Sequence, residues 1–202
     1  MVKTISKILS VVFHPLVMPS LGLLMIYNSG TYVSMLSTEA ERIIFLIVAV
    51  GTFLLPLSLI PVFIYTRMVS TVEMKDRSER FFPLLITSAL FYIDYFVLRS
   101  LMVPRIIQLF ILAATLSVVL TSLINIKWKI SAHMVGIGGV IGALLAMSFR
   151  LLADISVFLI ISVVIAGLLG FARLSLNAHK PSEVYGGLGL GFFTNMLLLI
   201  FF

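Results

Sequence analysis

The sequence predicts an all-α fold: a polytopic membrane helix bundle of about seven transmembrane helices, forming a single domain over residues 1–202. Two observations support this prediction. Hydrophobic residues make up 61% of the chain and charged residues 11%, whereas soluble domains average roughly half and a quarter. Uncharged runs such as 43–66 are also long enough to cross a bilayer as a helix. A water-soluble fold is therefore excluded.

The first span is expected at Val11–Asn28. Two lysines precede it, as in a secretory signal peptide, but the run lacks a small-residue cleavage site and contains His14, Pro15 and Pro19. We expect a retained helix that is kinked at the prolines. His14 would then lie near the interface, with a place at the entrance of a site as the alternative.

Six further spans follow, each an apolar run of about 20 residues bounded by charged or polar residues. They are expected at Ile43–Thr66, Phe81–Leu98, Ile106–Ile124, Ile130–Phe149, Asp154–Phe171 and Glu183–Phe202. Glycines in the fifth and seventh spans permit close helix packing, so these two helices should be central. The glycines are Gly136, Gly138, Gly139 and Gly142, and Gly186, Gly187, Gly189 and Gly191.

Connections separated by two spans must lie on the same membrane face, which brings segments 74–83, 127–133 and 173–183 together. The positive-inside rule would make this face cytoplasmic, although cations that bind a substrate would weaken that bias. Nucleic acid is not an expected partner, because the basic residues form no aromatic-interleaved patch. The face carries Lys3, Lys7, Arg67, Lys75, Arg77, Arg80, Lys127, Lys129, Arg173 and Lys180, against Arg42, Arg99, Arg105 and Arg150 opposite.

The segment 173–183 contains an arginine, a histidine and a carboxylate. Glu183 follows His179 by four residues, so its carboxylate can hydrogen-bond one ring nitrogen and leave the other free as a nucleophile or base. Arg173 can hold a phosphate through two parallel hydrogen bonds. The alternative is a surface pair at helical spacing.

Two other segments of the same face suit a phosphoryl group. Ser131 and nearby backbone N–H groups begin a glycine-rich helix and can hold an anion, while His133 can act as a general acid. Lys75, Arg77 and Arg80 place cations before the third span. The alternative for His133 is an interfacial histidine hydrogen-bonded to backbone. The alternative for Lys75, Arg77 and Arg80 is a solvated charged loop.

These segments resemble, in order, the motifs of the type 2 phosphatidic acid phosphatase superfamily, membrane lipid phosphatases related to vanadium haloperoxidases. The third family motif is Ser-Arg, five residues, His, three residues, Asp. It looks like Ala172-Arg173, His179 and Glu183, with the spacing kept and glutamate in place of aspartate. The resemblance covers a phosphatase-like core at about 67–202.

The other two motifs depart further from the family pattern. Residues 130–133, Ile-Ser-Ala-His, resemble Pro-Ser-Gly-His and retain only the serine and the histidine. The first motif, Lys, six residues, Arg-Pro, keeps Lys75 and the proline but has Phe82 in place of arginine. Arg77 and Arg80 are alternative sources of that guanidinium group.

The resemblance implies a phosphatase that uses no metal and no cofactor. His179 would attack phosphorus and form a phosphohistidine, Glu183 would orient it, and His133 would protonate the leaving group. The implied substrate is a phospholipid or polyprenyl (di)phosphate. The compactness of the chain predicts a bacterial inner membrane protein. The resemblance implies a periplasmic site, whereas the charge count favours the cytoplasm. Phosphate-binding residues would be Lys75, Arg80, Ser131 and Arg173.

Two rival functions remain open at this point. One is a relative that binds a lipid phosphate without hydrolysing it, since two of the three motifs are incomplete. The other is a small transporter, in which polar residues would line a passage through the bundle. In that case Asp94, an ionisable residue within the third span, would face the passage.

Overall fold

The computed structural model describes residues 1–71, 74 and 78–202, so Lys75 and Arg77 lie outside the described residues. The described chain consists of helices and their connections, without a strand. Seven helical segments are long and apolar enough to cross a membrane, which confirms the predicted class. The long helices are α1 (Val2–Val12), α2 (Met18–Tyr27), α3 (Thr38–Ala49), α4 (Leu55–Tyr65), α5 (Phe81–Ser100), α6 (Arg105–Asn125), α7 (Ala132–Leu151), α8 (Ser156–Ser175) and α9 (Pro181–Phe201).

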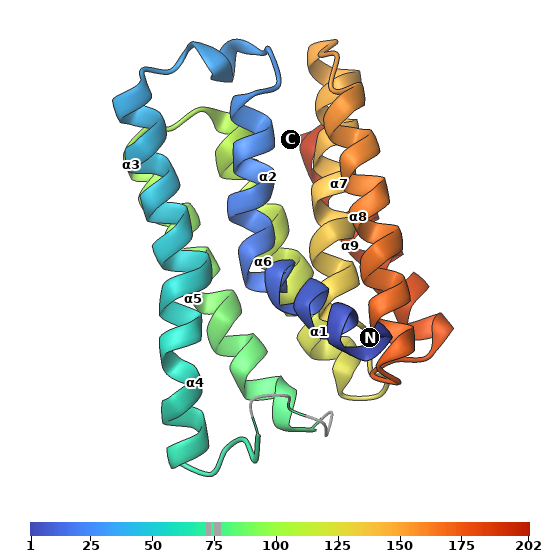
Figure 1. Cartoon of the computed structure of the whole chain (residues 1–202). Coiled ribbons are helices and arrows are strands. Elements are labelled where there is room, and N and C mark those ends of the chain that lie inside the picture. The colour runs from blue at the N-terminus through green and yellow to red at the C-terminus, as the bar shows by residue number, and fades with distance from the viewer. Residues whose placement is uncertain (72–73, 75–77) are drawn as a thin grey trace.

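Short helical turns connect some of these helices. They are η1 (Pro15–Val17), η2 (Tyr32–Met35), the π-helical turn η3 (Val50–Leu54) and η4 (Ser78–Arg80). Figure 1 shows α3, α4 and α5 on one side of the bundle and α7, α8 and α9 on the other, with α2 and α6 between them. Helix α1 lies at the lower end, turned away from the direction of α2 and packed beside α8.

The first span begins at Val2 rather than Val11 and is two helices rather than one. The break falls at His14, whose backbone is extended (φ −63°, ψ 142°) because it precedes Pro15. Pro19 lies within the first turn of α2, where its missing N–H costs little. The predicted break at the prolines is therefore confirmed, and the predicted start is wrong.

Two other boundaries differ from the sequence prediction in ways that matter. Helix α3 begins at Thr38 rather than Ile43 because the Ser37 hydroxyl caps it, accepting a hydrogen bond from Ala40 N–H (3.2 Å). Helix α8 continues to Ser175 rather than ending at Phe171. Arg173 therefore lies in the last turn of a helix and not in a loop.

Helices α7 and α9 approach each other closely through glycine, as predicted. A Cβ atom at Gly187 would lie 2.6 Å from the Ser131 carbonyl oxygen, and Gly138, Gly142 and Gly191 each face the backbone of the opposite helix. Only α7 is central, however: 67% of its most apolar window is buried, against 28% for α9. Helix α9 packs on α7 and, less extensively, on α6, while the rest of its surface is half-buried or exposed.

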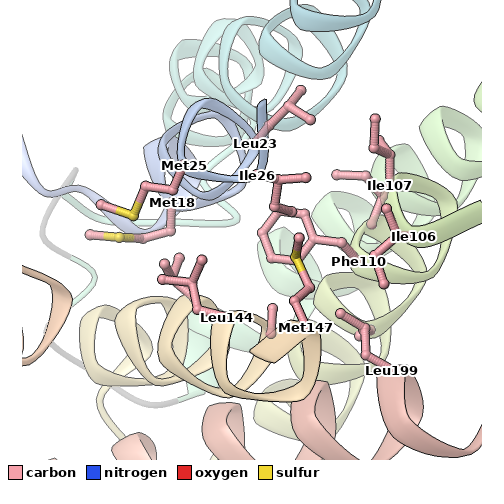
Figure 2. Close-up of a cluster of buried hydrophobic side chains, with 14 of the residues drawn as sticks. Met18, Leu23, Met25, Ile26, Ile106, Ile107, Phe110, Leu144, Met147 and Leu199 are labelled. Carbon is pink, nitrogen blue, oxygen red and sulfur yellow. The ribbon is translucent and has the colours of Figure 1, made fainter. Parts of the chain in front are cut away.

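The core lies where α2, α6, α7 and α9 meet (Figure 2). Phe110 of α6 reaches across to α2, where a Cβ atom at Gly22 would lie 2.5 Å from its ring. Met18 and Ile26 of α2 and Met147 of α7 complete the contact. This packing fixes the helices that carry the candidate site.

Candidate functional site

The three segments expected on one face do meet, at the end of the bundle where α7 and α9 begin. The Ser131 N–H donates a hydrogen bond to the Glu183 carbonyl oxygen (3.2 Å), joining the 126–131 connection to the first turn of α9. Arg80 lies close enough for Glu183 to act on it electrostatically. The structure therefore brings together six of the seven predicted site residues: Arg80, Ser131, His133, Arg173, His179 and Glu183.

The connection between α8 and α9 has a conformation that its sequence dictates. Asn177 adopts a left-handed conformation (φ 50°), which asparagine tolerates better than most residues. Its N–H bonds to the Leu174 carbonyl (2.9 Å), and the Ala178 N–H bonds to the Arg173 carbonyl (3.1 Å). This is the Schellman pattern of helix termination. It turns the chain so that His179 returns toward the end of the bundle.

His179 and Glu183 form a buried pair, which excludes the surface-pair interpretation. Each residue is 8% exposed, and His179 Nδ1 lies 2.9 Å from Glu183 Oε2. The same oxygen accepts a hydrogen bond from Lys180 N–H (3.1 Å), as a glutamate at the third helical position does when it caps a helix. A carboxylate accepts and cannot donate, so Nδ1 carries the hydrogen of a neutral His179. Nε2 then holds a free lone pair.

The surroundings of His179 favour its neutral form. The pKa of His179 falls from 6.5 to about 4, because burial lowers it most and the charges of Arg173 and Arg80 also lower it, against the opposing effect of Glu183. Burial also lowers the pKa of Arg80, opposed by Glu183, but an arginine stays charged at neutral pH. A neutral imidazole thus lies close to two guanidinium groups. This combination suits a nucleophile that attacks an anion.

Ser131 is the N-cap residue of α7, at the predicted helix start. Its side chain is 0% exposed, and its hydroxyl oxygen makes no hydrogen bond within the described part of the chain. An unpaired buried hydroxyl costs roughly 1–3 kcal/mol. A hydroxyl in this state at a helix N-terminus is a suitable ligand for an anion.

His133, in the first turn of α7, is bonded to backbone. Its Nε2 lies 3.0 Å from the Ser10 carbonyl oxygen, the arrangement that the non-catalytic interpretation predicted. It is nevertheless part of the same cluster, since it interacts electrostatically with both Arg173 and His179. Arg173 Nη1 in turn donates to the Ser10 hydroxyl (3.3 Å).

The structure adds three polar residues to this end of the bundle. Ser10 contacts both His133 and Arg173, and the His14 ring lies edge-on to the His133 ring with centroids 5.6 Å apart. Asn125 is 1% exposed, and neither of its amide atoms is hydrogen-bonded in the described chain. It lies one helical turn beyond Ser122, whose hydroxyl donates to the Phe81 carbonyl next to Arg80 (3.2 Å).

These additions were only partly visible in the sequence. For His14, the sequence left two interpretations: an interfacial histidine or a residue at the entrance of a site. In the structure the His14 ring lies beside the cluster. Ser10 carried no local signal, because its role depends on how α1 packs on α8. Asn125 had one available signal: it is an amide at the end of an apolar span, two residues before Lys127.

Asp94 lies away from this cluster. It is 4% exposed and lines a cavity of about 350 Å³ between η3 and α5, where its carboxyl group lies against Gly51. The other lining residues are Leu46, Ile47, Val50, Gly51, Leu55, Leu90, Ile93 and Val97. Among the described residues that line it, Asp94 is the one that is ionisable, so the cavity does not have the character of a polar passage.

Neither a scan against protein-family models nor searches of curated proteins and of solved structures found a match for this chain.

Proposed function

We propose that this chain is a membrane-embedded, metal-independent lipid phosphatase that hydrolyses a phospholipid or polyprenyl (di)phosphate through a phosphohistidine at His179. The observation that carries the proposal is the buried His179–Glu183 pair (2.9 Å) within electrostatic reach of Arg80 and Arg173. A histidine held by a carboxylate beside two guanidinium groups is equipped to attack a phosphate ester.

In the proposed reaction the Nε2 lone pair of His179 forms a bond to phosphorus while the bond to the leaving oxygen breaks. The neutral His133 takes a proton from the phosphate monoanion on Nδ1 and gives it to that oxygen, while Nε2 stays bonded to the Ser10 carbonyl. Water then attacks phosphorus, the P–N bond breaks, and His133 takes back a proton. Arg80, Arg173 and the Ser131 hydroxyl would stabilise the equatorial oxygens.

A lipid substrate fits the position of the cluster. The site residues lie at the ends of membrane-spanning helices, where a phosphate group can enter while its hydrocarbon chain stays in the bilayer. Trp128, which is partly exposed in the adjacent connection, is typical of residues at a membrane interface. Helix α1 exposes Ile5, Ile8 and Val11 beside two lysines, which suits an interfacial helix over anionic lipid.

The test is phosphate release by the purified protein in detergent, over phosphatidic acid, other phospholipid phosphates, and polyprenyl phosphate and diphosphate. We expect release from at least one lipid in the presence of a chelator, and at least a thousandfold loss in His179→Ala. Quenching the wild type in alkaline detergent after reaction with phosphorus-radiolabelled substrate should trap a phosphoprotein that is stable in alkali and labile in acid. Equal release by wild type and His179→Ala would refute the proposal, as would a strict requirement for Mg²⁺.

The two rival functions predict other results. A non-hydrolysing relative would bind lipid phosphate and release none. A transporter would use a polar passage, but the cavity at Asp94 is lined otherwise by apolar residues and glycine. A transporter of that kind also does not require a buried histidine–carboxylate pair such as His179 and Glu183.

A further inference from the structure

The three histidines of the chain lie in one connected group, although only two were predicted to be site residues. His14 contacts His133 edge-on at a centroid distance of 5.6 Å and interacts electrostatically with Arg173. His133 interacts electrostatically with His179. The first residue comes from the break between α1 and α2, the second from α7 and the third from the connection before α9.

Each imidazole has one nitrogen held by the protein, and the partner fixes which nitrogen carries hydrogen. The Glu183 carboxylate accepts from His179 Nδ1, and the Ser10 carbonyl accepts from His133 Nε2. His14 differs, because the Leu16 N–H donates to His14 Nδ1 (3.3 Å). Nδ1 of His14 is therefore an acceptor without hydrogen, and a neutral imidazole then carries its proton on Nε2.

This hydrogen bond also opposes protonation of His14. An imidazolium would place a hydrogen on Nδ1 facing the Leu16 N–H, so this hydrogen bond forms only with the neutral ring. His14 Nε2–H makes no hydrogen bond to another described residue. It is thus a fixed donor, unlike His179 and His133, which present a bare nitrogen.

We propose that His14 is a phosphate-binding residue of this site, a neutral imidazole whose Nε2–H donates to a phosphoryl oxygen held by Arg173. The assignment of this site to phosphate rests on the proposed function. Ser10 places the N-terminal segment for this role, since it bonds to both His133 and Arg173. The site is then completed by a segment that lies outside the core resembling the phosphatases.

Two substitutions separate the donor from the structural role of the ring. In His14→Asn the side-chain oxygen can replace Nδ1 as the acceptor for Leu16 N–H, while the Nε2 donor is lost. In His14→Gln the amide nitrogen takes the place of Nε2, while the Nδ1 acceptor is lost. Val12→Ala, at an exposed position in the same segment, is the control and should match the wild type.

The measurement is binding of inorganic phosphate by calorimetry in detergent, together with the KM for the best lipid substrate and the unfolding temperature. We expect His14→Asn to weaken phosphate binding and raise KM by about tenfold to 100-fold, as expected for a hydrogen bond to a charged group. His14→Gln should stay within about fivefold of the wild type, because it keeps the donor.

The outcomes distinguish this proposal from the proposed function. Unchanged binding in His14→Asn would overturn the role of His14 and leave the phosphatase intact, and so would equal losses in the Asn and Gln variants. A wild type that binds phosphate but hydrolyses no lipid phosphate would refute the phosphatase, while the difference between the two variants would still support His14. A wild type that neither binds phosphate nor hydrolyses any lipid phosphate would overturn both.

Discussion

The Ser131 N–H and the Glu183 carbonyl oxygen are joined by a hydrogen bond of 3.2 Å, so the start of α7 and the first turn of α9 form one unit. Gly187 lies one turn further along α9 and faces the Ser131 carbonyl group. A Cβ atom at Gly187 would lie 2.6 Å from the Ser131 carbonyl oxygen. The Ser131 hydroxyl and the orientation of His179 therefore depend on the same helix contact.

Gly187→Ala should separate α7 from α9 and impair the site. The new Cβ would meet backbone, which cannot turn aside as a side chain can, and overpacking of this kind typically costs about 1–3 kcal/mol. We expect a lower unfolding temperature in detergent and at least a tenfold loss of phosphatase activity. Gly189→Ala is the matched control: no atom lies within 4 Å of its Cβ position, so stability should be unchanged or slightly higher. Equal effects of the two substitutions would contradict this packing.

Ser131→Ala should separate binding from stability. The hydroxyl is buried without a partner in the described chain, so its removal should leave the unfolding temperature unchanged or raise it. Phosphate affinity should fall about tenfold, as expected for one lost hydrogen bond to an anion. Ser122→Ala loses a hydrogen bond to the Phe81 carbonyl instead and should lower stability. A destabilised Ser131→Ala protein with normal phosphate affinity would show that the hydroxyl is structural.

Glu183→Gln should lower kcat by about 10²–10⁴-fold, the range for groups that assist proton transfer and orientation. The amide can present a donor to His179 Nδ1, which then loses its hydrogen and favours the wrong tautomer. Glu183→Asp, which restores the residue type of the related motif, should retain more activity than Gln. A Gln variant as active as the wild type would remove Glu183 from the mechanism.

The acidic limb of kcat/KM should lie below pH 6.5, the ordinary imidazole value. The nucleophile must be neutral, and burial together with two arginines lowers the pKa of His179 to about 4. Activity should therefore be lost only as pH falls through about 4, because protonation then removes the Nε2 lone pair. A pH–rate profile of the wild type checks this, with circular dichroism at each pH to exclude unfolding. A limb at pH 6.5 or above would contradict a buried nucleophile.

Asp94→Asn should retain full phosphatase activity. Asp94 lies 14 residues beyond Arg80, which is about 20 Å along α5. Its cavity is lined otherwise by apolar residues and glycine, so no part of the proposed reaction passes through it. Phosphate release in detergent checks the prediction. A complete loss of activity in a well-folded Asp94→Asn protein would link the two regions and revive the transport hypothesis.

The limits of the sequence prediction are clearest at the two ends of the candidate site. The spacing of Arg173, His179 and Glu183 predicted a carboxylate-bound histidine, and the pair is present. The predicted end of α8 is too early, because the helix continues past the predicted boundary at Phe171 and ends in the Schellman turn at Asn177. The predicted first span begins too late and omits most of α1, since the inward face of α1 is formed by serines rather than by an apolar stripe.

The apolar runs of the sequence are enough to predict a bundle of membrane-spanning helices, because backbone groups in lipid must be satisfied within each helix and apolar length then sets each span. The order of the runs also predicts that three polar connections share one face, because helices reverse direction at each crossing. That Ser10 and His14 join this face is visible only in the three-dimensional packing. Their contacts to Arg173 and His133 span 119 to 163 residues of chain and depend on how α1 packs against α8. No local pattern encodes a contact of that kind, because it arises from the fit of whole helices.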